Sequence, residues 1–179
     1  MRIVAGHLRS RRLASPPESV YLRPTTDIVR ESLFNILSNR ISFDGISVAD
    51  IFCGTGSLGL ESISRGASEC VFVDKDISYA KKNSDAFGVS DICGFIRSDA
   101  IRFLLTSEKN KFDIIFADPP YIYNKYEELI KAASEHNALF VLEHHTGEKF
   151  SSESDKILLK KKHGISEITI YNFRDKNEE

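Results

Sequence analysis

The sequence predicts an α/β fold with a mostly parallel, seven-stranded sheet, helices on both of its faces, and an antiparallel hairpin at the C-terminal end. Five short β-type runs alternate with helix-like stretches between residues 48 and 142. Strands that alternate with helices in this way form parallel sheets. Two further β-type runs then face each other across His163-Gly164, which is a hairpin signal.

Each element follows from its own local pattern. The first helix is expected to start at Thr25 or Thr26, either of which can cap it, and to end near Asn39. The expected strands are Val48–Phe52, Val71–Asp74, Phe95–Arg97, Ile114–Ala117 and Leu139–Leu142. The helices between them are expected at Leu58–Arg65, Ile77–Phe87, Ala100–Ser107 and Lys125–Glu135, and the hairpin at Lys156–Lys162 and Ser166–Phe173. This order is typical of Rossmann-like class I methyltransferases.

Length and composition indicate one globular domain. The 179 residues are 41% apolar and 28% charged, with a net charge of −2, as in soluble proteins. No apolar run approaches membrane length and the N-terminus does not resemble a signal peptide, so no membrane partner is expected. Three cysteines without CxxC spacing predict neither a disulfide framework nor a metal site. A monomer in a reducing cytoplasm is the simplest expectation.

The N-terminal residues are basic, although the whole chain is slightly acidic. The first forty residues contain three acids and seven arginines, namely Arg2, Arg9, Arg11, Arg12, Arg23, Arg30 and Arg40. Arginine suits bidentate phosphate contacts, and the alternation in Gly6–Leu13 predicts a strand with one wet, basic face. We therefore expect an RNA-contacting arm at residues 1–24, a main domain at 25–174 and a disordered tail at 175–179. The expected RNA contacts are Arg2, His7, Arg9, Arg11, Arg12 and Arg23; the alternative is an ordinary solvated basic segment.

A glycine loop follows the first expected strand. Gly54, Gly56 and Gly59 satisfy GxGxxG, so a nicotinamide oxidoreductase and a simple tight turn are both alternatives. Asp50 discriminates between the cofactors. A carboxylate about 4–5 Å from each phosphate charge of a dinucleotide would cost on the order of 3–4 kcal/mol per pair at an effective dielectric near 20. The same carboxylate attracts the ammonium group of S-adenosylmethionine, which is the favoured cofactor.

Another acid ends the second expected strand, and a further one follows the third. Asp74 stands where an acid can accept hydrogen bonds from both ribose hydroxyls of a nucleoside cofactor. Asp99 can accept from the adenine amine, cap the next helix, or do both. The expected cofactor-binding residues are Asp50, Phe52, Gly54, Thr55, Gly56, Asp74, Lys75, Asp99 and Ala100.

The candidate catalytic motif is Asp118-Pro119-Pro120-Tyr121, directly after the fourth expected strand. Ligands of open α/β sheets bind outside the carboxyl ends of the strands, so Asp118 is expected beside the reactive centre. Its carboxylate and the Pro119 carbonyl can each accept one N–H of a planar amine and direct the amine's lone pair at a methyl group. Tyr121 can stack on a base that is unpaired or flipped out. Taken alone, the motif is equally consistent with a rigid turn.

These motifs resemble the RsmD-type bacterial methyltransferases along nearly the whole chain. The resemblance is carried by Met1–Gly6 with Arg9, Arg11, Arg12 and Leu13, by Leu22–Asp27 with Val29–Glu31, and by Asp50–Glu61, Ser64–Ala67, Asp118–Tyr121 and Ile168–Tyr171. Many amino methyltransferases share the glycine and Asp-Pro-Pro-Tyr motifs, whereas Arg23-Pro24-Thr25-Thr26-Asp27 and the basic N-terminus narrow the resemblance to this family. The chain departs from the family at Ala5 and Ser10, where glycine is frequent, and at Cys53, where alanine or serine is common.

The resemblance implies methyl transfer from S-adenosylmethionine to the N2 amine of a guanine in 16S ribosomal RNA, leaving S-adenosylhomocysteine. It also implies that the partner is the small ribosomal subunit or its assembly intermediate. One alternative is an amino methyltransferase that acts on adenine in nucleic acid or on a protein glutamine. Another is a non-catalytic RNA-binding module that keeps the fold. The Asp-Pro-Pro-Tyr motif by itself does not distinguish guanine from adenine.

Overall fold

One sheet of seven strands runs through the molecule. The computed structural model of the protein describes residues 1–17 and 27–175. Across the sheet the strands follow the order β3 (Cys93–Arg97), β2 (Glu69–Asp74), β1 (Ser47–Ile51), β4 (Ile114–Ala117), β5 (Leu139–His145), β7 (Ser166–Asn172) and β6 (Ile157–His163). The neighbours from β3 to β5 are parallel, and β7 is antiparallel to both β5 and β6. The expected mostly parallel sheet with a C-terminal hairpin is confirmed.

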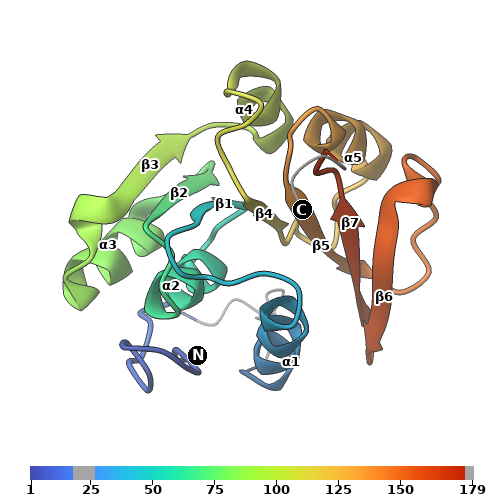
Figure 1. Ribbon diagram of the computed structural model, residues 1–179. Helices are drawn as coiled ribbons and strands as arrows, with labels where there is room; N and C mark the ends of the chain where they lie inside the picture. The colour runs from blue at the N-terminus through green and yellow to red at the C-terminus, as the bar shows by residue number, and fades with distance from the viewer. Residues whose placement is uncertain (18–26, 176–179) are drawn as a thin grey trace.

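Helices cover both faces of the sheet (Figure 1). One face carries α1 (Asp27–Ser38), α2 (Ser57–Ser64) and α3 (Ser78–Phe87), and the other carries α4 (Ala100–Thr106) and α5 (Tyr126–Ser134). Two short 3-10 turns, η1 (Ser90–Ile92) and η2 (Ser154–Lys156), precede β3 and β6. Within residues 1–17 and 27–175, no helix is long and apolar enough to cross a membrane, and no cluster of three or more potential metal ligands is found.

Most element boundaries agree with the sequence-based expectation to within two residues. The main difference is β5, which continues to His145 instead of ending at Leu142. The cause is tertiary, because β7 pairs with β5 all the way to His145 opposite Ser166. The expected caps Thr25 and Thr26, like the expected RNA contact Arg23, lie outside the described residues. Residues 176–179 of the expected tail also lie outside them, whereas the Asp175 N–H donates to the Asn137 side-chain oxygen at 2.7 Å.

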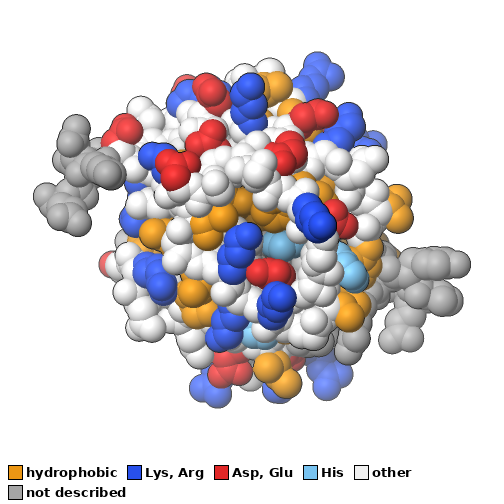
Figure 2. Space-filling view, turned by 90° about the vertical axis from the view of Figure 1, so that its right-hand side faces the viewer, with side chains coloured by type: hydrophobic (Ala, Val, Ile, Leu, Met, Phe, Trp, Pro, Cys, Tyr) orange, Lys and Arg blue, Asp and Glu red, His pale blue; other side chains and the backbone are white. Residues whose placement is uncertain are grey.

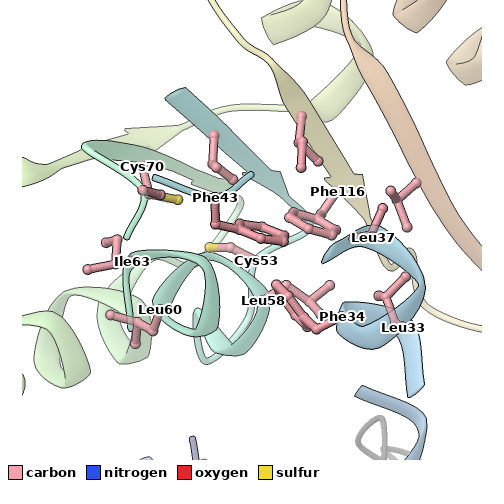
Figure 3. Packing of buried hydrophobic residues seen from close by; sticks show 14 of the residues in the cluster. Leu33, Phe34, Leu37, Phe43, Cys53, Leu58, Leu60, Ile63, Cys70 and Phe116 are labelled. Carbon is pink, nitrogen blue, oxygen red and sulfur yellow. The ribbon is translucent and has the colours of Figure 1, made fainter. Parts of the chain in front are cut away.

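The core between the sheet and the α1–α2 layer contains a cluster of phenylalanine rings among aliphatic side chains. Phe34 of α1 lies next to Phe116 of β4 and next to Phe43, with ring centroids 5.6 and 5.3 Å apart. Figure 3 shows these rings together with Leu37 and Leu58, which α1 and α2 contribute from below the sheet. Burying a side chain of this size contributes roughly 1.5–3 kcal/mol. This layer therefore fixes α2, and with it the glycine loop that opens α2, against the sheet.

Gly59 allows α2 to lie close to the sheet. A Cβ at this position would come within 2.4 Å of a Phe72 ring carbon and 2.5 Å of the Cys70 sulfur, both on β2. Figure 3 shows Cys70 beside α2. The last glycine of GxGxxG is therefore required for helix–strand packing. This requirement is independent of any cofactor.

The N-terminal arm is not a strand, so the expectation for Gly6–Leu13 was wrong. Residues 5–10 form a bend and turns, and Arg2 and Arg12 form an isolated antiparallel bridge. The chain reverses because Gly6 and Ser10 adopt left-handed conformations, with φ of 78° and 70°. The apolar residues of the arm nevertheless point inward: Ile3, Leu8 and Leu13 are buried in the same core as α1 and α2.

The arm is fastened to α2 by backbone hydrogen bonds. The fully buried Glu61 carboxylate accepts the N–H groups of Val4 at 2.7 Å and Ala5 at 3.0 Å, and also pairs with Arg65 at 2.9 Å. At Gly6 the two segments touch so closely that a Cβ would lie 1.7 Å from the Ser64 carbonyl oxygen. The arm and α2 consequently form one packed unit.

Candidate active site

Four acids occupy the carboxyl ends of four adjacent parallel strands. Asp50 lies in β1, Asp74 ends β2, Asp99 follows β3 and Asp118 follows β4. Ile51 of β1 pairs with Val73 on one side and Ala117 on the other. Asp74 and Asp118 therefore follow at equivalent positions on either side of β1, about 4.8 Å per strand apart. The structure brings these predicted residues to one edge of the sheet.

Asp50 is almost fully buried beneath the glycine loop. Its side chain is 2% exposed, and one carboxylate oxygen accepts the Gly59 N–H at 2.8 Å. Burial is the main cause that raises the pKa of Asp50 well above its usual value; the charges of Asp118 and Asp74 add to it and the Gly59 N–H opposes it. A cation placed near these carboxylates would relieve their repulsion, whereas a pyrophosphate would increase it.

The glycine loop presents open backbone at the strand edge. Gly54 and Gly56 are left-handed, with φ of 51° and 78°. A Cβ at Gly54 would meet no described atom within 4 Å, whereas one at Gly56 would lie 3.0 Å from Phe72. The Gly54 N–H donates to Asp74 at 2.9 Å, so Asp74 holds the loop's shape. A ligand can therefore approach the main chain at Gly54.

The remaining predicted cofactor residues surround this loop. Phe52 follows β1 in a left-handed conformation with φ of 61°, so it lies beyond the strand to which it was assigned. Asp99 caps α4, because its side chain accepts the Arg102 N–H at 3.1 Å. The expected capping role of Asp99 is therefore confirmed. Ala100 is buried at the start of α4, and Lys75 is exposed beside Asp74.

Asp118-Pro119-Pro120-Tyr121 forms a turn at the end of β4. The Tyr123 N–H donates to the Pro120 carbonyl at 2.8 Å, which closes the turn. Asp118 is half-buried and Pro119 is buried, while Pro120 and Tyr121 are exposed. The Tyr121 ring meets the His145 ring edge-on, with centroids 6.3 Å apart. The turn therefore holds a half-buried carboxylate at Asp118 and an exposed aromatic ring at Tyr121.

Sequence reasoning missed Tyr123, which connects this turn to the glycine loop. Its ring meets Phe52 edge-on at 5.1 Å and Tyr126 at 5.3 Å. The Tyr123 hydroxyl is buried without a hydrogen-bond partner among the described residues. Burial, followed by the charge of Asp99, raises its pKa, so the hydroxyl stays neutral. The local signal was a second aromatic residue shortly after the Asp-Pro-Pro-Tyr motif, whereas its contact with Phe52 is decided by the tertiary structure.

Asn83 of α3 was also missed, and no local pattern marked it. It is 1% exposed, and its side chain accepts the Ala14 N–H at 2.8 Å. Its amide group donates to the carbonyls of Ala14 at 3.0 Å and Thr55 at 2.9 Å. The Thr55 hydroxyl in turn lies 3.6 Å from the Met1 sulfur. The arm and the glycine loop are therefore joined through one buried amide.

The basic residues of the arm divide into two groups. Arg11 is held by the protein: its guanidinium donates to the Ala86 carbonyl at 2.6 Å and lies 4.8 Å from the centre of the Phe87 ring. Arg9 and Arg12 are exposed and make no side-chain hydrogen bond or ion pair with other described residues. Arg2 and His7 are exposed as well, and lie 3.3 Å from Asp27 and 3.1 Å from the Ser64 carbonyl. Of the other arginines near the N-terminus, Arg30 is fully buried against Asp27.

Comparison with known proteins places this architecture in a family. The sequence profile described as Conserved hypothetical protein 95 matches residues 1–172. YlbH of Bacillus subtilis, named as a candidate rRNA methyltransferase, is 34% identical over 97% of this chain and 100% of its own length. The ribosomal RNA small subunit methyltransferase D of Haemophilus influenzae is 37% identical over 78% of this chain and 73% of its own.

Solved structures show the same fold. The candidate methyltransferase yhhF of Escherichia coli has a TM-score of 0.80 and 28% identity, and the alignment covers 98% of this chain and 99% of that one. RsmC, a 16S rRNA N2 G1207 methyltransferase of Thermus thermophilus solved with AdoMet and guanosine, shares the fold at a TM-score of 0.68 and 20% identity, over 96% of this chain and 49% of that one. The chain belongs to the RsmD-type methyltransferase family, whose profile carries the description Conserved hypothetical protein 95.

Proposed function

We propose that the protein transfers a methyl group from S-adenosylmethionine to the exocyclic N2 amine of a guanine in 16S ribosomal RNA. One observation carries the proposal: the Asp118–Tyr121 turn and the glycine loop over Asp50 meet at one edge of the sheet, where Phe52 contacts Tyr123. Membership of the RsmD-type family supports the reaction class. The names of the relatives support ribosomal RNA as the acceptor.

The residues at this edge fit S-adenosylmethionine. When bound, this cofactor supplies a methyl group carried on a sulfonium cation. Asp50, whose carboxyl is buried and crowded by Asp74 and Asp118, offers negative charge to the ammonium group of the cofactor. The open backbone at Gly54 admits a ligand at close range. The loop residues Thr55 and Gly56, with Phe52, Asp74, Lys75, Asp99 and Ala100, complete the proposed cofactor site.

Asp118 and Pro119 are proposed to orient the acceptor amine. A conjugated amine is a poor nucleophile because its lone pair is delocalised into the ring. Two acceptors, the Asp118 carboxylate and the Pro119 carbonyl, each take one N–H, so the lone pair points toward the methyl group. Orientation of this kind supplies much of the acceleration. With the cofactor bound, the nitrogen–methyl bond would form as the sulfur–methyl bond breaks, the sulfur would keep the bonding pair in S-adenosylhomocysteine, and the amine would release one proton to solvent.

Tyr121 is proposed to hold the base by stacking. Its side chain is 43% exposed and its ring is supported at the edge by His145. Stacking of a base on such a ring contributes about 1–3 kcal/mol. Pro120 keeps the turn stiff, because a proline ring fixes its own backbone angle φ. The target base must therefore be unpaired or flipped out of a helix.

The cellular context follows from this substrate. We infer that the enzyme works in the cytoplasm as a monomer, on the small ribosomal subunit or one of its assembly intermediates. The exposed residues Arg2, His7, Arg9 and Arg12 are proposed to contact RNA phosphates. Arg11 is placed against α3 by the structure, so its contribution to RNA binding is proposed to be indirect.

A methyl-transfer assay tests the function. Labelled S-adenosylmethionine is incubated with the protein and small ribosomal subunits from cells that lack the enzyme, beside naked 16S RNA, duplex DNA and free protein substrates. The label is expected in 16S RNA of the subunits, at the N2 position of one guanine when digested nucleosides are analysed by mass spectrometry. Label that enters only adenine, DNA or protein glutamine would instead support the alternative acceptors.

Replacing Arg9 and Arg12 together with Ala is expected to weaken RNA binding and to reduce its salt dependence. Two lost phosphate contacts lower the slope of log K against log salt by roughly 1.4–1.8. The measurement is a salt titration of binding to small subunits. Arg11→Ala is the matched comparison: loss of its carbonyl bonds is expected to cost roughly 1 kcal/mol of stability, with a smaller change in the salt slope. If the double variant and the wild type have equal slopes of log K against log salt, the arm is an ordinary solvated basic segment that does not contact RNA.

A further inference from the structure

The outermost strand β6 carries a run of positive charge at its carboxyl end. The carboxyl ends of the strands, where Asp118 and Tyr121 lie, are called the catalytic edge of the sheet. The last four residues of β6 are Lys160, Lys161, Lys162 and His163. Because β7 is antiparallel to both β5 and β6, β6 runs in the same direction as β5 and β4. The carboxyl end of β6, with its lysines, therefore lies at the same edge as Asp118 and Tyr121.

The three lysines do not share one environment. Lys161 faces α1 and donates to the Ser32 hydroxyl at 2.8 Å. Lys160 and Lys162 are exposed and alternate with it, so they project from the other face of the strand. Lys160 lies over the Phe150 ring, 5.7 Å from its centroid. The two exposed lysines are therefore directed outward from the hairpin.

Neither exposed lysine forms an ion pair with a described acid. In residues 1–17 and 27–175 the ion pairs are Arg2–Asp27, Arg30–Asp27 and Arg65–Glu61. Lys162 is opposite Glu167 in the strand register, yet the two form no ion pair. Near the middle of Figure 2, which shows this side of the molecule, several Lys or Arg side chains surround a smaller number of acidic ones, with histidine nearby; acidic and basic side chains are mixed in the upper part of the view. Basic side chains therefore gather at the end of β6 although the chain as a whole carries −2.

This surface is continuous with the proposed base-binding residue. The His145 ring at the end of β5 contacts the Tyr121 ring. The next residue, Thr146, donates its N–H to the Ile165 carbonyl in the β6–β7 turn at 2.8 Å. β6 stands three strand positions from β4 in the sheet, or roughly 14 Å at about 4.8 Å per strand. A few nucleotides of RNA span that distance.

We propose that Lys160 and Lys162 form a second RNA-contacting surface, which binds phosphate groups of the nucleotides that flank the target base. The inference rests on the proposed function, because it takes RNA as the substrate. The arm packs against α2 and α3 on one side of the molecule, and the hairpin lies at the opposite end of the sheet (Figure 1). In this proposal the RNA contacts the arm on one side of Tyr121 and the end of β6 on the other.

Lysines on an edge strand also have a purely protective use. They prevent the unpaired edge from joining another sheet. Ile157, Leu158 and Leu159 at the start of β6 carry no charge, and a register shift between Ile157 and Leu159 already interrupts the regular edge there. The charge is confined to the half of the strand beside the catalytic edge. That position favours a substrate contact.

The test replaces Lys160 and Lys162 together with Gln. Steady-state methylation of small subunits that lack the mark is measured across a salt series. At roughly 0.15 M salt, losing two phosphate contacts is expected to raise KM for the subunit about tenfold. The slope of log KM against log salt is expected to fall by roughly 1.4–1.8. The turnover number and the affinity for S-adenosylmethionine are expected to stay within about twofold, because neither lysine lies at the cofactor edge between β1 and β3.

Lys111→Gln with Lys131→Gln is the matched control. Both residues are exposed, and Lys111 lies over a phenylalanine ring, 5.6 Å from its centroid, much as Lys160 does. They lie near the amino ends of the strands, opposite the catalytic edge, because Lys111 precedes β4 and Lys131 lies in the last turn of α5 before β5. This control is expected to behave as the wild type. Lys160→Arg with Lys162→Arg keeps the charge and is expected to restore the wild-type KM.

The outcomes separate the inference from the function on which it rests. If the wild type methylates the subunit but the Gln variant matches its control in KM and salt slope, the lysines only protect the edge and the inference is overturned. If the Gln variant aggregates, the same comparison is made with the single Lys162→Gln variant, for which half the slope change is expected. If the wild type transfers no methyl group to small subunits, the proposed function itself fails.

Discussion

Asp118→Ala is expected to reduce methyl transfer about a thousandfold while S-adenosylmethionine binding stays within about threefold. The side chain removed is the acceptor that orients the amine, and loss of one group that stabilises a transition state typically costs 10²–10³ in turnover. Cofactor binding changes little because two effects oppose each other. The cofactor's cation loses one nearby charge, but the pKa of Asp50 falls toward its usual value, since Asp118 is one of the charges that raise it.

Single-turnover methylation and calorimetric cofactor binding measure this separation. Asp118→Asn keeps the size of the side chain and one acceptor oxygen, but adds an N–H₂ group that faces the amine. It is therefore also expected to be strongly impaired. Asp91→Ala, which removes an exposed carboxylate from η1, is the control and is expected to be fully active. Unchanged turnover of Asp118→Ala would refute its catalytic role, and a parallel loss of cofactor binding would reassign Asp118 to the cofactor site.

Asp50→Asn is expected to weaken S-adenosylmethionine binding at least tenfold and to make the ligand-free protein more stable. A unit charge pair at about 4 Å is worth up to about 4 kcal/mol at an effective dielectric near 20, so removing the carboxylate costs binding. The stability gain has the opposite origin. Burial raises the pKa of Asp50, so its charged form is disfavoured in the folded protein.

The pH dependence follows from the direction of that pKa. A raised pKa stabilises the fold at pH values below the carboxyl's ordinary value near 4, and this contribution is lost as the pH rises through the folded-state pKa. Above the ordinary pKa of the carboxyl, folding of the wild type requires Asp50 either to bury its charge or to take up a proton, and Asn requires neither. Cofactor affinity of the wild type is expected to fall as the pH is lowered through the raised pKa, because the cation then meets a neutral acid.

Thermal unfolding with and without S-adenosylmethionine, repeated across pH, tests both halves of the Asp50 prediction. The Asn variant is expected to melt a few degrees higher without cofactor, to gain less on cofactor addition, and to lose the pH dependence of binding. The Asn side-chain oxygen can still accept the Gly59 N–H, so the hydrogen bond to α2 is preserved. A variant that is less stable and binds cofactor normally would show that Asp50 serves only to hold the start of α2.

Local sequence patterns determined the order and type of the elements. The bounds expected for β4, Ile114–Ala117, agree with the structure, because a short apolar run between turn signals is a local property. The sequence also predicted, for a related reason, that the strand-end acids lie close together, namely Asp50, Asp74, Asp99 and Asp118. Carboxyl ends of parallel strands meet at one edge whatever the details of packing.

The tertiary structure alone decided how the arm and the site are joined. The contacts that do so link residues far apart in the chain: Val4 with Glu61, 57 positions away, Ala14 with Asn83, 69 positions away, and Arg11 with Phe87, 76 positions away. Periodicity in a short window carries no information about such partners. It predicted a strand for an arm whose apolar residues are buried by α1 and α2 instead. The sequence by itself thus determined the chemistry available at the strand ends, and the packing decided which further side chains support it.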